Sequence, residues 1–368
     1  MQNKKDGDNY FVVTCVIYLI ILAAIIFLRI AGALGWFDAM SNQLSDTVFS
    51  LISQLGVMLL IPLVGMTIYR RKMTSVPMTF AEFAKYDSES LENRNKGTFS
   101  FLGFKKPSVS TVGWAILLGF ILFLFNMFIS GFFNGILAFL GHRGAAAGGD
   151  ESSFVGVGGL FITLTLTAVL PGLCEETAHR GMLLRGFSSR IGIMNAVLLS
   201  SLCFGLMHLN IVQCFYAMIL GYFMGLAVVA TGTIWTSIIM HFMNNAIGIY
   251  FMFASQNNWF GGNFLSGLAG FLGGMSFIFY LAFFMCLFFL IVAIIHKLAR
   301  EKFINEHKND EQPPRLFPTH GLTAIRYYLS YGENRNREPM RPIERTLIYG
   351  IIFLGVVITG MTLVWGFL

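Results

Sequence analysis

FVGVGGLFITLTLTAVLPGLCEETAHRG, residues 154–181, is apolar and uncharged up to Cys174 and then presents two glutamates, a histidine and an arginine in quick succession. A helix needs roughly 20 consecutive, mostly apolar residues to cross the hydrocarbon core of a membrane. The segment therefore predicts a membrane-spanning helix that carries ionisable side chains near its end.

Runs of the same kind recur along the chain. They begin near Tyr10, Val48, Thr111, Phe154, Ile193, Ile211, Thr233, Phe264 and Leu347. Of the 368 residues, 55% are apolar and only 12% are charged, whereas about a quarter are charged in an average soluble protein. This composition excludes a soluble enzyme, a disordered chain and a secreted disulfide scaffold, and the unbroken runs exclude a transmembrane β-barrel. We expect an all-α, polytopic transmembrane bundle of about nine spans, with the active site inside it.

The basic residues between the runs predict the orientation in the membrane. Lys and Arg are concentrated in segments 70–110 and 297–345, whereas 31–46 and 255–263 have none. Cytoplasmic loops carry the excess of Lys and Arg, so we expect a multi-pass protein of the cell membrane with its N-terminus in the cytoplasm and its C-terminus outside. The net charge of +6 belongs to these loops and predicts no nucleic-acid partner. The five cysteines lie in apolar runs without a CxxC pair, so we interpret them as core residues.

Three regions follow from the positions of the runs. Residues 1–153 hold the N-terminal spans with cytoplasmic loop 70–110, residues 154–255 the catalytic core, and residues 256–368 the C-terminal spans with cytoplasmic loop 297–345. Segments 73–106 and 300–345 are hydrophilic and suit short amphipathic helices on the membrane surface.

Glu175 and Glu176 are the most conspicuous residues of the fourth run, because a charge inside a membrane costs roughly 2.5–3.5 kcal/mol on insertion scales. Glu176 and Arg180 are four residues apart, so they are expected to pair along one face of the helix. Glu175 is rotated by about 100° and faces elsewhere, where it is available as a general base. His179 is interpreted as a stacking or interfacial histidine.

Two further helices carry polar groups. Glu175 and His208 are each about sixteen residues from a turn near residues 190–192, or ~24 Å along a helix, so an antiparallel hairpin places them at one depth. In the seventh run, His241 and Asn245 are four residues apart on one face. Carboxylate, imidazole and amide groups within lipid favour a hydrolytic or metal site, although a single buried Asn is also typical of contacts between helices.

Together these segments resemble the signature of the CPBP family, which comprises CAAX proteases and bacteriocin-processing enzymes. The family shows E-E-x-x-x-R, F-x-x-x-H and H-x-x-x-N on three membrane helices, and this chain has Glu175-Glu176…Arg180, Phe204…His208 and His241…Asn245. The resemblance covers roughly residues 154–250.

The resemblance implies an intramembrane endopeptidase of the glutamate type, without a cofactor, that cuts a peptide bond of a membrane-associated or lipidated protein. Glu175 with His208 would activate a water molecule, and His241 and Asn245 would hold the oxyanion. Glu176 and Arg180 would support the site.

Two alternatives remain open at the sequence level. Glu175, His208 and His241 are also a suitable ligand set for catalytic zinc, with water in the fourth position. A non-proteolytic immunity, scaffold or transport protein is the alternative outside enzymes, but an inactive relative is expected to lose Glu175 or His208. The oligomeric state is left open.

Overall fold

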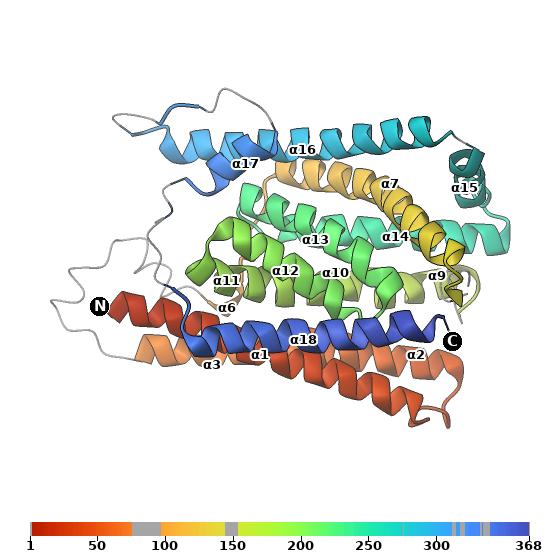
Figure 1. The fold of residues 1–368 in the computed structure, drawn as a ribbon, viewed down its shortest axis with the longest axis horizontal. Helices are drawn as coiled ribbons and strands as arrows, with labels where there is room; N and C mark the ends of the chain where they lie inside the picture. The colour runs from red at the N-terminus through yellow and green to blue at the C-terminus, as the bar shows by residue number, and fades with distance from the viewer. Residues whose placement is uncertain are drawn as a thin grey trace.

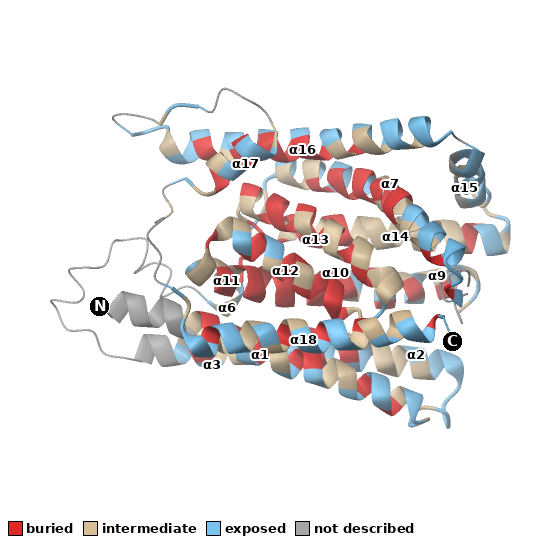
Figure 2. Ribbon diagram, viewed as in Figure 1, coloured by how far each residue is buried: buried red, intermediate tan, exposed pale blue. Residues whose placement is uncertain are grey.

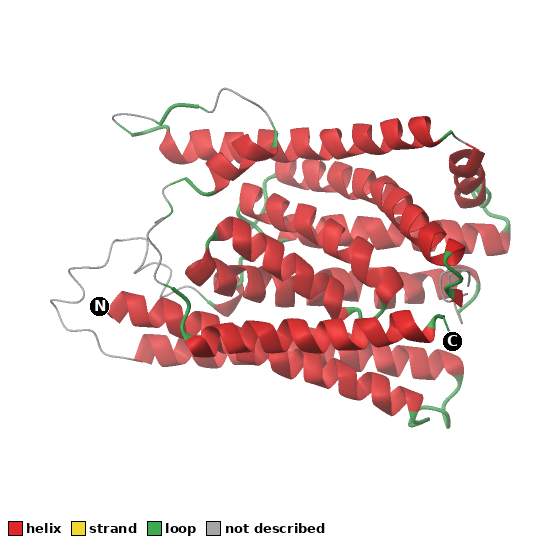
Figure 3. Ribbon diagram, in the orientation of Figure 1, coloured by secondary structure: helices red, strands yellow, loops and turns green. Residues whose placement is uncertain are grey.

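The computed structural model describes residues 2–75, 97–143, 154–274, 276–310, 314–316, 321–331, 333 and 339–367. Within these residues every regular element is a helix (Figure 3). The N-terminal helices are α1 (Gln2–Ala33), α2 (Asn42–Leu51), η1 (Ile52–Leu60), α3 (Ile61–Ser75), α6 (Thr98–Phe101) and α7 (Val109–Phe139). The prediction of an all-α, polytopic bundle is confirmed.

The remaining helices form the centre and the C-terminal part. The fourth run forms α9 (Gly156–Leu164), η2 (Thr165–Val169), α10 (Leu170–Glu176), η3 (Thr177–Leu183) and α11 (Leu184–Ile191). They are followed by α12 (Ile193–Met207), α13 (Ile211–Thr231), α14 (Trp235–Asn257), α15 (Phe264–Gly274), α16 (Phe277–His307), α17 (Leu322–Leu329) and α18 (Pro342–Trp365). The elements labelled η are π-helical.

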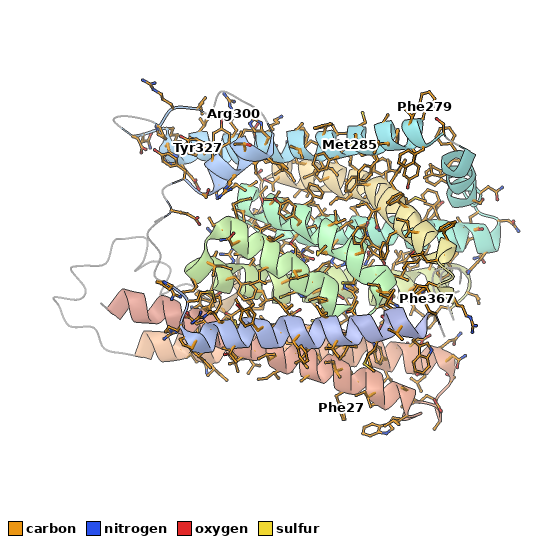
Figure 4. The ribbon with its side chains drawn as sticks, viewed as in Figure 1. Phe27, Phe279, Met285, Arg300, Tyr327 and Phe367 are labelled. Atoms are coloured by element: carbon orange, nitrogen blue, oxygen red, sulfur yellow. The ribbon has the colours of Figure 1, made fainter. Side chains whose placement is uncertain are left out.

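The helices lie roughly along the long axis of the molecule in three tiers (Figure 1). Helices α7 and α16 run along one side, α1, α3 and α18 along the other, and α10 to α14 lie between them. Buried residues are concentrated in this middle tier (Figure 2). The side chains of Phe27 and Phe279 point away from the bundle on opposite sides (Figure 4) and are 56% and 66% exposed, as expected of positions that face lipid.

The number of full-length spans differs from the predicted nine. In the described part of the chain, eight helices are long and apolar enough to cross a membrane. The run that starts at Ile193 forms α12, whose 15 residues extend only ~22 Å, less than the ~30 Å hydrocarbon core. Helix α12 therefore returns from one end of the bundle and stops inside it.

The C-terminal part also differs from the expected boundaries. The run at Phe264 does not form one span, because α15 ends at Gly274 and a separate helix, α16, begins at Phe277. Helix α16 continues to His307, so the segment expected to be a loop from residue 297 starts as helix. Segment 300–345 contains the short helix α17, and its expected place on the membrane surface stays a prediction, whereas most of segment 73–106 lies outside the described residues.

Candidate active site

The fourth membrane passage changes its helical geometry on both sides of the adjacent glutamates. It is π-helical at Thr165–Val169 and Thr177–Leu183, and the α-helical turns between them hold Glu175 and Glu176. A π-helix pairs each N–H with the carbonyl five residues earlier, and such stretches are frequent at functional sites because they free backbone groups and rotate side chains. The two glutamates thus lie on a short α-helical segment between two π-helical stretches.

Glu176 is completely buried and serves two partners. Its Oε1 atom accepts hydrogen bonds from Nη1 of Arg180 at 2.8 Å and from Nδ1 of His241 at 2.9 Å. Arg180, also fully buried, donates from Nη2 to the carbonyl of Gly221 at 2.9 Å and lies over the ring of Phe204 at 4.4 Å. The predicted pair of Glu176 and Arg180 is present, and it also joins α10 to α13 and α14.

Glu175 points in a different direction from its neighbour. Its Oε1 atom accepts a hydrogen bond from Nε2 of Gln54, in η1, at 2.9 Å. Its Oε2 atom is buried and has no hydrogen-bond partner among the described residues. One oxygen of this carboxylate is therefore held in place, while the other keeps its lone pairs for a ligand.

His208 and His241 each use Nδ1 for a hydrogen bond to another group of the protein. Nδ1 of His208 lies 2.8 Å from the carbonyl oxygen of Phe204, which only accepts, so Nδ1 carries the proton. Nδ1 of His241 likewise donates to the Glu176 carboxylate. In the neutral rings Nε2 is then an acceptor, and His241 can donate from Nε2 only when both ring nitrogens carry a proton.

Three asparagines form a chain of amides beside the glutamate. Nδ2 of Asn245 donates to the carbonyl of Thr167, in η2, at 2.9 Å. Nδ2 of Asn244 donates to Oδ1 of Asn245 at 2.9 Å, and Nδ2 of Asn126 lies 3.4 Å from Oδ1 of Asn244. These bonds fix which end of the Asn245 side chain is the donor. Its second Nδ2 hydrogen stays available to another acceptor.

A cavity of about 780 Å³ brings the predicted groups together. It is lined by Glu175, His208, His241 and Asn245, which come from α10, the end of α12 and α14. Arg180 and Glu176 do not line it and lie behind its wall. His179 is not part of the cavity lining either, because its ring is buried, with Nε2 3.2 Å from the Tyr18 hydroxyl and an edge against Phe204. This agrees with its interpretation as a stacking histidine.

Sequence reasoning missed three polar residues of the cavity. Gln54, Asn126 and Arg29 all line it. Each lies within an apolar run, and polar side chains in such runs usually face the interior of a bundle or a polar cavity. The sequence therefore carries a signal for these residues, namely a polar side chain inside an apolar run.

The predicted ligands of a zinc ion do not form a cluster. Among the described residues, no three His, Cys, Asp or Glu side chains are grouped so that they could hold a metal. In this arrangement Glu175, His208 and His241 are not grouped as the three ligands of a metal ion.

The chain was also compared with known proteins. Residues 157–247 match the family model described as type II CAAX prenyl endopeptidase, Rce1-like. No curated protein and no solved structure matches the chain. The matched segment contains Glu175, His208, His241 and Asn245, the four predicted residues that line the cavity. Residues 157–247 are therefore similar to the Rce1-like family, within a multi-pass membrane protein.

Proposed function

We propose that this protein is an intramembrane endopeptidase in which Glu175 is the general base. The observation that carries the proposal is the unpartnered Oε2 atom of Glu175 in a cavity that also presents two imidazoles and a carboxamide. General-base catalysis requires a basic atom within reach of the proton that it removes. Glu175 offers such an atom, and Gln54 fixes its orientation.

In this mechanism a water molecule attacks the carbonyl carbon of the scissile peptide bond. Its proton passes to Oε2 of Glu175, and Nε2 of His208 orients the water. The carbonyl oxygen becomes an oxyanion, which accepts hydrogen bonds from Nδ2 of Asn245 and from the imidazolium of His241. Glu175 returns the proton to the leaving nitrogen as the carbon–nitrogen bond breaks, which gives a carboxylic acid and an amine.

The position of the cavity supports a membrane-associated peptide as the substrate. Its walls combine the polar groups with apolar side chains such as Leu122, Met207 and Met240. The description of the matched family supports the more specific proposal that the peptide belongs to a prenylated protein.

The test uses purified protein in lipid vesicles and a set of membrane peptides, with cleavage read by mass spectrometry. Glu175→Gln is expected to abolish cleavage and to leave the thermal unfolding temperature unchanged, because it keeps the shape of the side chain. His208→Ala should behave alike, and Asn245→Ala should lower the rate about 10²- to 10³-fold, as loss of one oxyanion donor does. The control is Glu301→Gln, which alters an exposed carboxylate of α16.

Metal dependence is measured in the same assay. Cleavage by the wild-type protein is expected to continue in the presence of a chelator. Loss of activity on chelation, restored by zinc and matched by one bound zinc ion per chain, would replace this mechanism with a zinc-dependent one. Normal cleavage by Glu175→Gln would rule out the glutamate mechanism.

A further inference from the structure

Asn126 carries a buried hydrogen-bond acceptor that the proposed mechanism does not use. The residue lies in α7, outside residues 157–247, and its side chain lines the same cavity as Glu175. Its Oδ1 atom is buried and has no hydrogen-bond partner among the described residues. Buried polar atoms of folded proteins nearly always have a partner, so an exception that lines a candidate active site points to a ligand that supplies a donor.

The neighbouring amides fix which end of the Asn126 side chain is the acceptor. Nδ2 of Asn126 lies 3.4 Å from Oδ1 of Asn244, and Nδ2 of Asn244 donates to Oδ1 of Asn245 at 2.9 Å. Nδ2 of Asn245 donates to the carbonyl of Thr167 at 2.9 Å. Because this carbonyl can only accept, each amide of the chain must turn its NH2 group toward the next acceptor. Oδ1 of Asn126 is therefore the open end of the chain.

The chain of amides offers the cavity a donor at one end and an acceptor at the other. The donor is the second Nδ2 hydrogen of Asn245, which the proposed mechanism assigns to the oxyanion, and the acceptor is Oδ1 of Asn126. An extended peptide presents the N–H and the C=O of one residue on the same side, and those of the next residue on the other side. A peptide whose scissile carbonyl faces Asn245 therefore turns the N–H of that residue, and of residues two positions away, toward the same side.

A backbone N–H of the substrate is the donor that fits this acceptor. A peptide N–H that leaves water for a buried site must find a hydrogen-bond partner there. Every residue except proline carries such a donor, whereas a donor on a side chain is present only in some substrate sequences. The carboxamide oxygen of Asn126 is neutral, so it suits a neutral N–H, and a cationic group would be drawn to the carboxylate of Glu175 in the same cavity.

We propose that Asn126 is a substrate-binding residue whose Oδ1 atom accepts a hydrogen bond from a backbone N–H of the peptide. This N–H belongs to the residue that supplies the scissile carbonyl or to a residue two positions from it, and we call these the same-side positions. The inference rests on the proposed peptidase function. It assigns to α7 a direct part in holding the substrate.

An ester scan of one cleaved peptide locates the N–H that is bound. Each peptide bond except the scissile one is replaced in turn by an ester, which removes one N–H and keeps the course of the backbone. For the wild-type protein, kcat/KM is expected to fall about five- to tenfold when the ester stands at a same-side position, which is the order of one neutral hydrogen bond. Unchanged kcat/KM for every same-side ester would overturn the proposal.

Variants of Asn126 then test the residue itself. Asn126→Leu removes the acceptor, so it should bring the ratio of kcat/KM for the all-amide peptide and the same-side ester close to one. A variant that only disturbed packing would slow both peptides and keep the wild-type ratio. Asn134→Leu, the same substitution on α7 outside this cavity, is the matched control and should keep that ratio. The wild-type ratio in Asn126→Leu, or in Asn126→Ala if the first variant does not fold, would overturn the proposal.

Binding separates this inference from the proposed peptidase function. A fluorescently labelled membrane peptide and its full set of ester analogues are titrated into Glu175→Gln and into the double variant Glu175→Gln/Asn126→Leu. Weaker binding of one ester analogue by the first protein and not by the second supports the role of Asn126 even if no peptide is ever cut. Equal affinities for all peptides in Glu175→Gln refute that role even if the wild-type protein is an active protease.

Discussion

At the residue scale, the adjacent Glu175 and Glu176 occupy different environments. Glu176 is enclosed behind the cavity wall by Arg180 and His241, whereas Glu175 lines the cavity. The difference follows from the turn of the helix, which rotates successive side chains by about 100°. One carboxylate stabilises the protein interior, and the other remains available for chemistry.

Glu176→Gln is therefore expected to act on stability first. It leaves Arg180 as a buried charge without its carboxylate, and breaking a buried pair in this way costs about 3–5 kcal/mol. Thermal unfolding in detergent should occur at a markedly lower temperature, and the double variant Glu176→Gln/Arg180→Gln should recover part of the loss. Since His241 also loses its carboxylate partner, the double variant should stay impaired in cleavage. If Glu175→Gln unfolds the protein while Glu176→Gln only inactivates it, the two roles are reversed.

Gln54 is expected to affect the rate and not substrate binding. Gln54→Leu removes the donor that orients Glu175, and a hydrogen bond to a charged group is worth about 1.5–3 kcal/mol, or about 10- to 100-fold in rate. We expect kcat to fall by about that factor with little change in KM. Gln256→Leu, at an exposed position near the end of α14, is the matched control. A change confined to KM would contradict a role in positioning Glu175.

At the element scale, the site depends on helices that are interrupted inside the bundle. Helix α11 turns directly into α12 at Gly192, whose positive φ of 88° suits glycine. Helix α12 stops after 15 residues, and Leu209 follows His208 in the left-handed region at φ 51°. The short helix thus leaves His208 at its end within the bundle instead of carrying it through the membrane.

Gly205 allows α12 and α13 to approach each other closely one turn before His208. A Cβ atom at Gly205 would lie 2.6 Å from the backbone oxygen of Cys214, which real contacts do not tolerate. Gly205→Ala should destabilise the protein by about 1–3 kcal/mol, as overpacking does, and should also lower cleavage because His208 moves. Gly113→Ala, at an open position of α7, should be neutral or slightly stabilising. Equal thermal stability of both variants would show that the helices separate without cost.

At the scale of the whole molecule, the chain ends lie at opposite ends of the bundle (Figure 1). Helix α12 enters the bundle from one end and α13 leads the chain back to that end, so the two helices together reverse the chain twice, as two full spans would. The helices after α13 therefore run in the same directions as in a nine-span topology. Which end faces the cytoplasm remains a prediction from the distribution of Lys and Arg.

A reporter that is active only on one side of the membrane tests this orientation. Fused after Leu368 it should report the outside, and inserted near Asn309, beyond the end of α16, it should report the cytoplasm. Replacement of the basic residues in 297–345 by neutral ones should weaken the signal at Asn309. The same location for both reporters would contradict the predicted topology.

The sequence by itself determined the all-α membrane fold and the residues that meet at the candidate site. The length of an apolar run predicts whether it crosses a membrane, and the four-residue spacing of Glu176 and Arg180 predicts that they pair on a helix. Both predictions depend only on the local sequence. Glu175 and His208 were expected at one depth because a hairpin relates their two runs by simple counting. These inferences required no knowledge of how the first 153 residues pack.

Only the tertiary structure decided which partners complete the site. Gln54 and Arg29 lie more than a hundred residues from Glu175, and their runs look like ordinary spans with a few scattered polar residues. The early end of α12 could not be predicted either, because a run of apolar residues does not show whether its helix crosses the whole membrane. The physical reason is that contacts between helices depend on their rotation and depth in the bundle, which packing fixes and local sequence patterns do not.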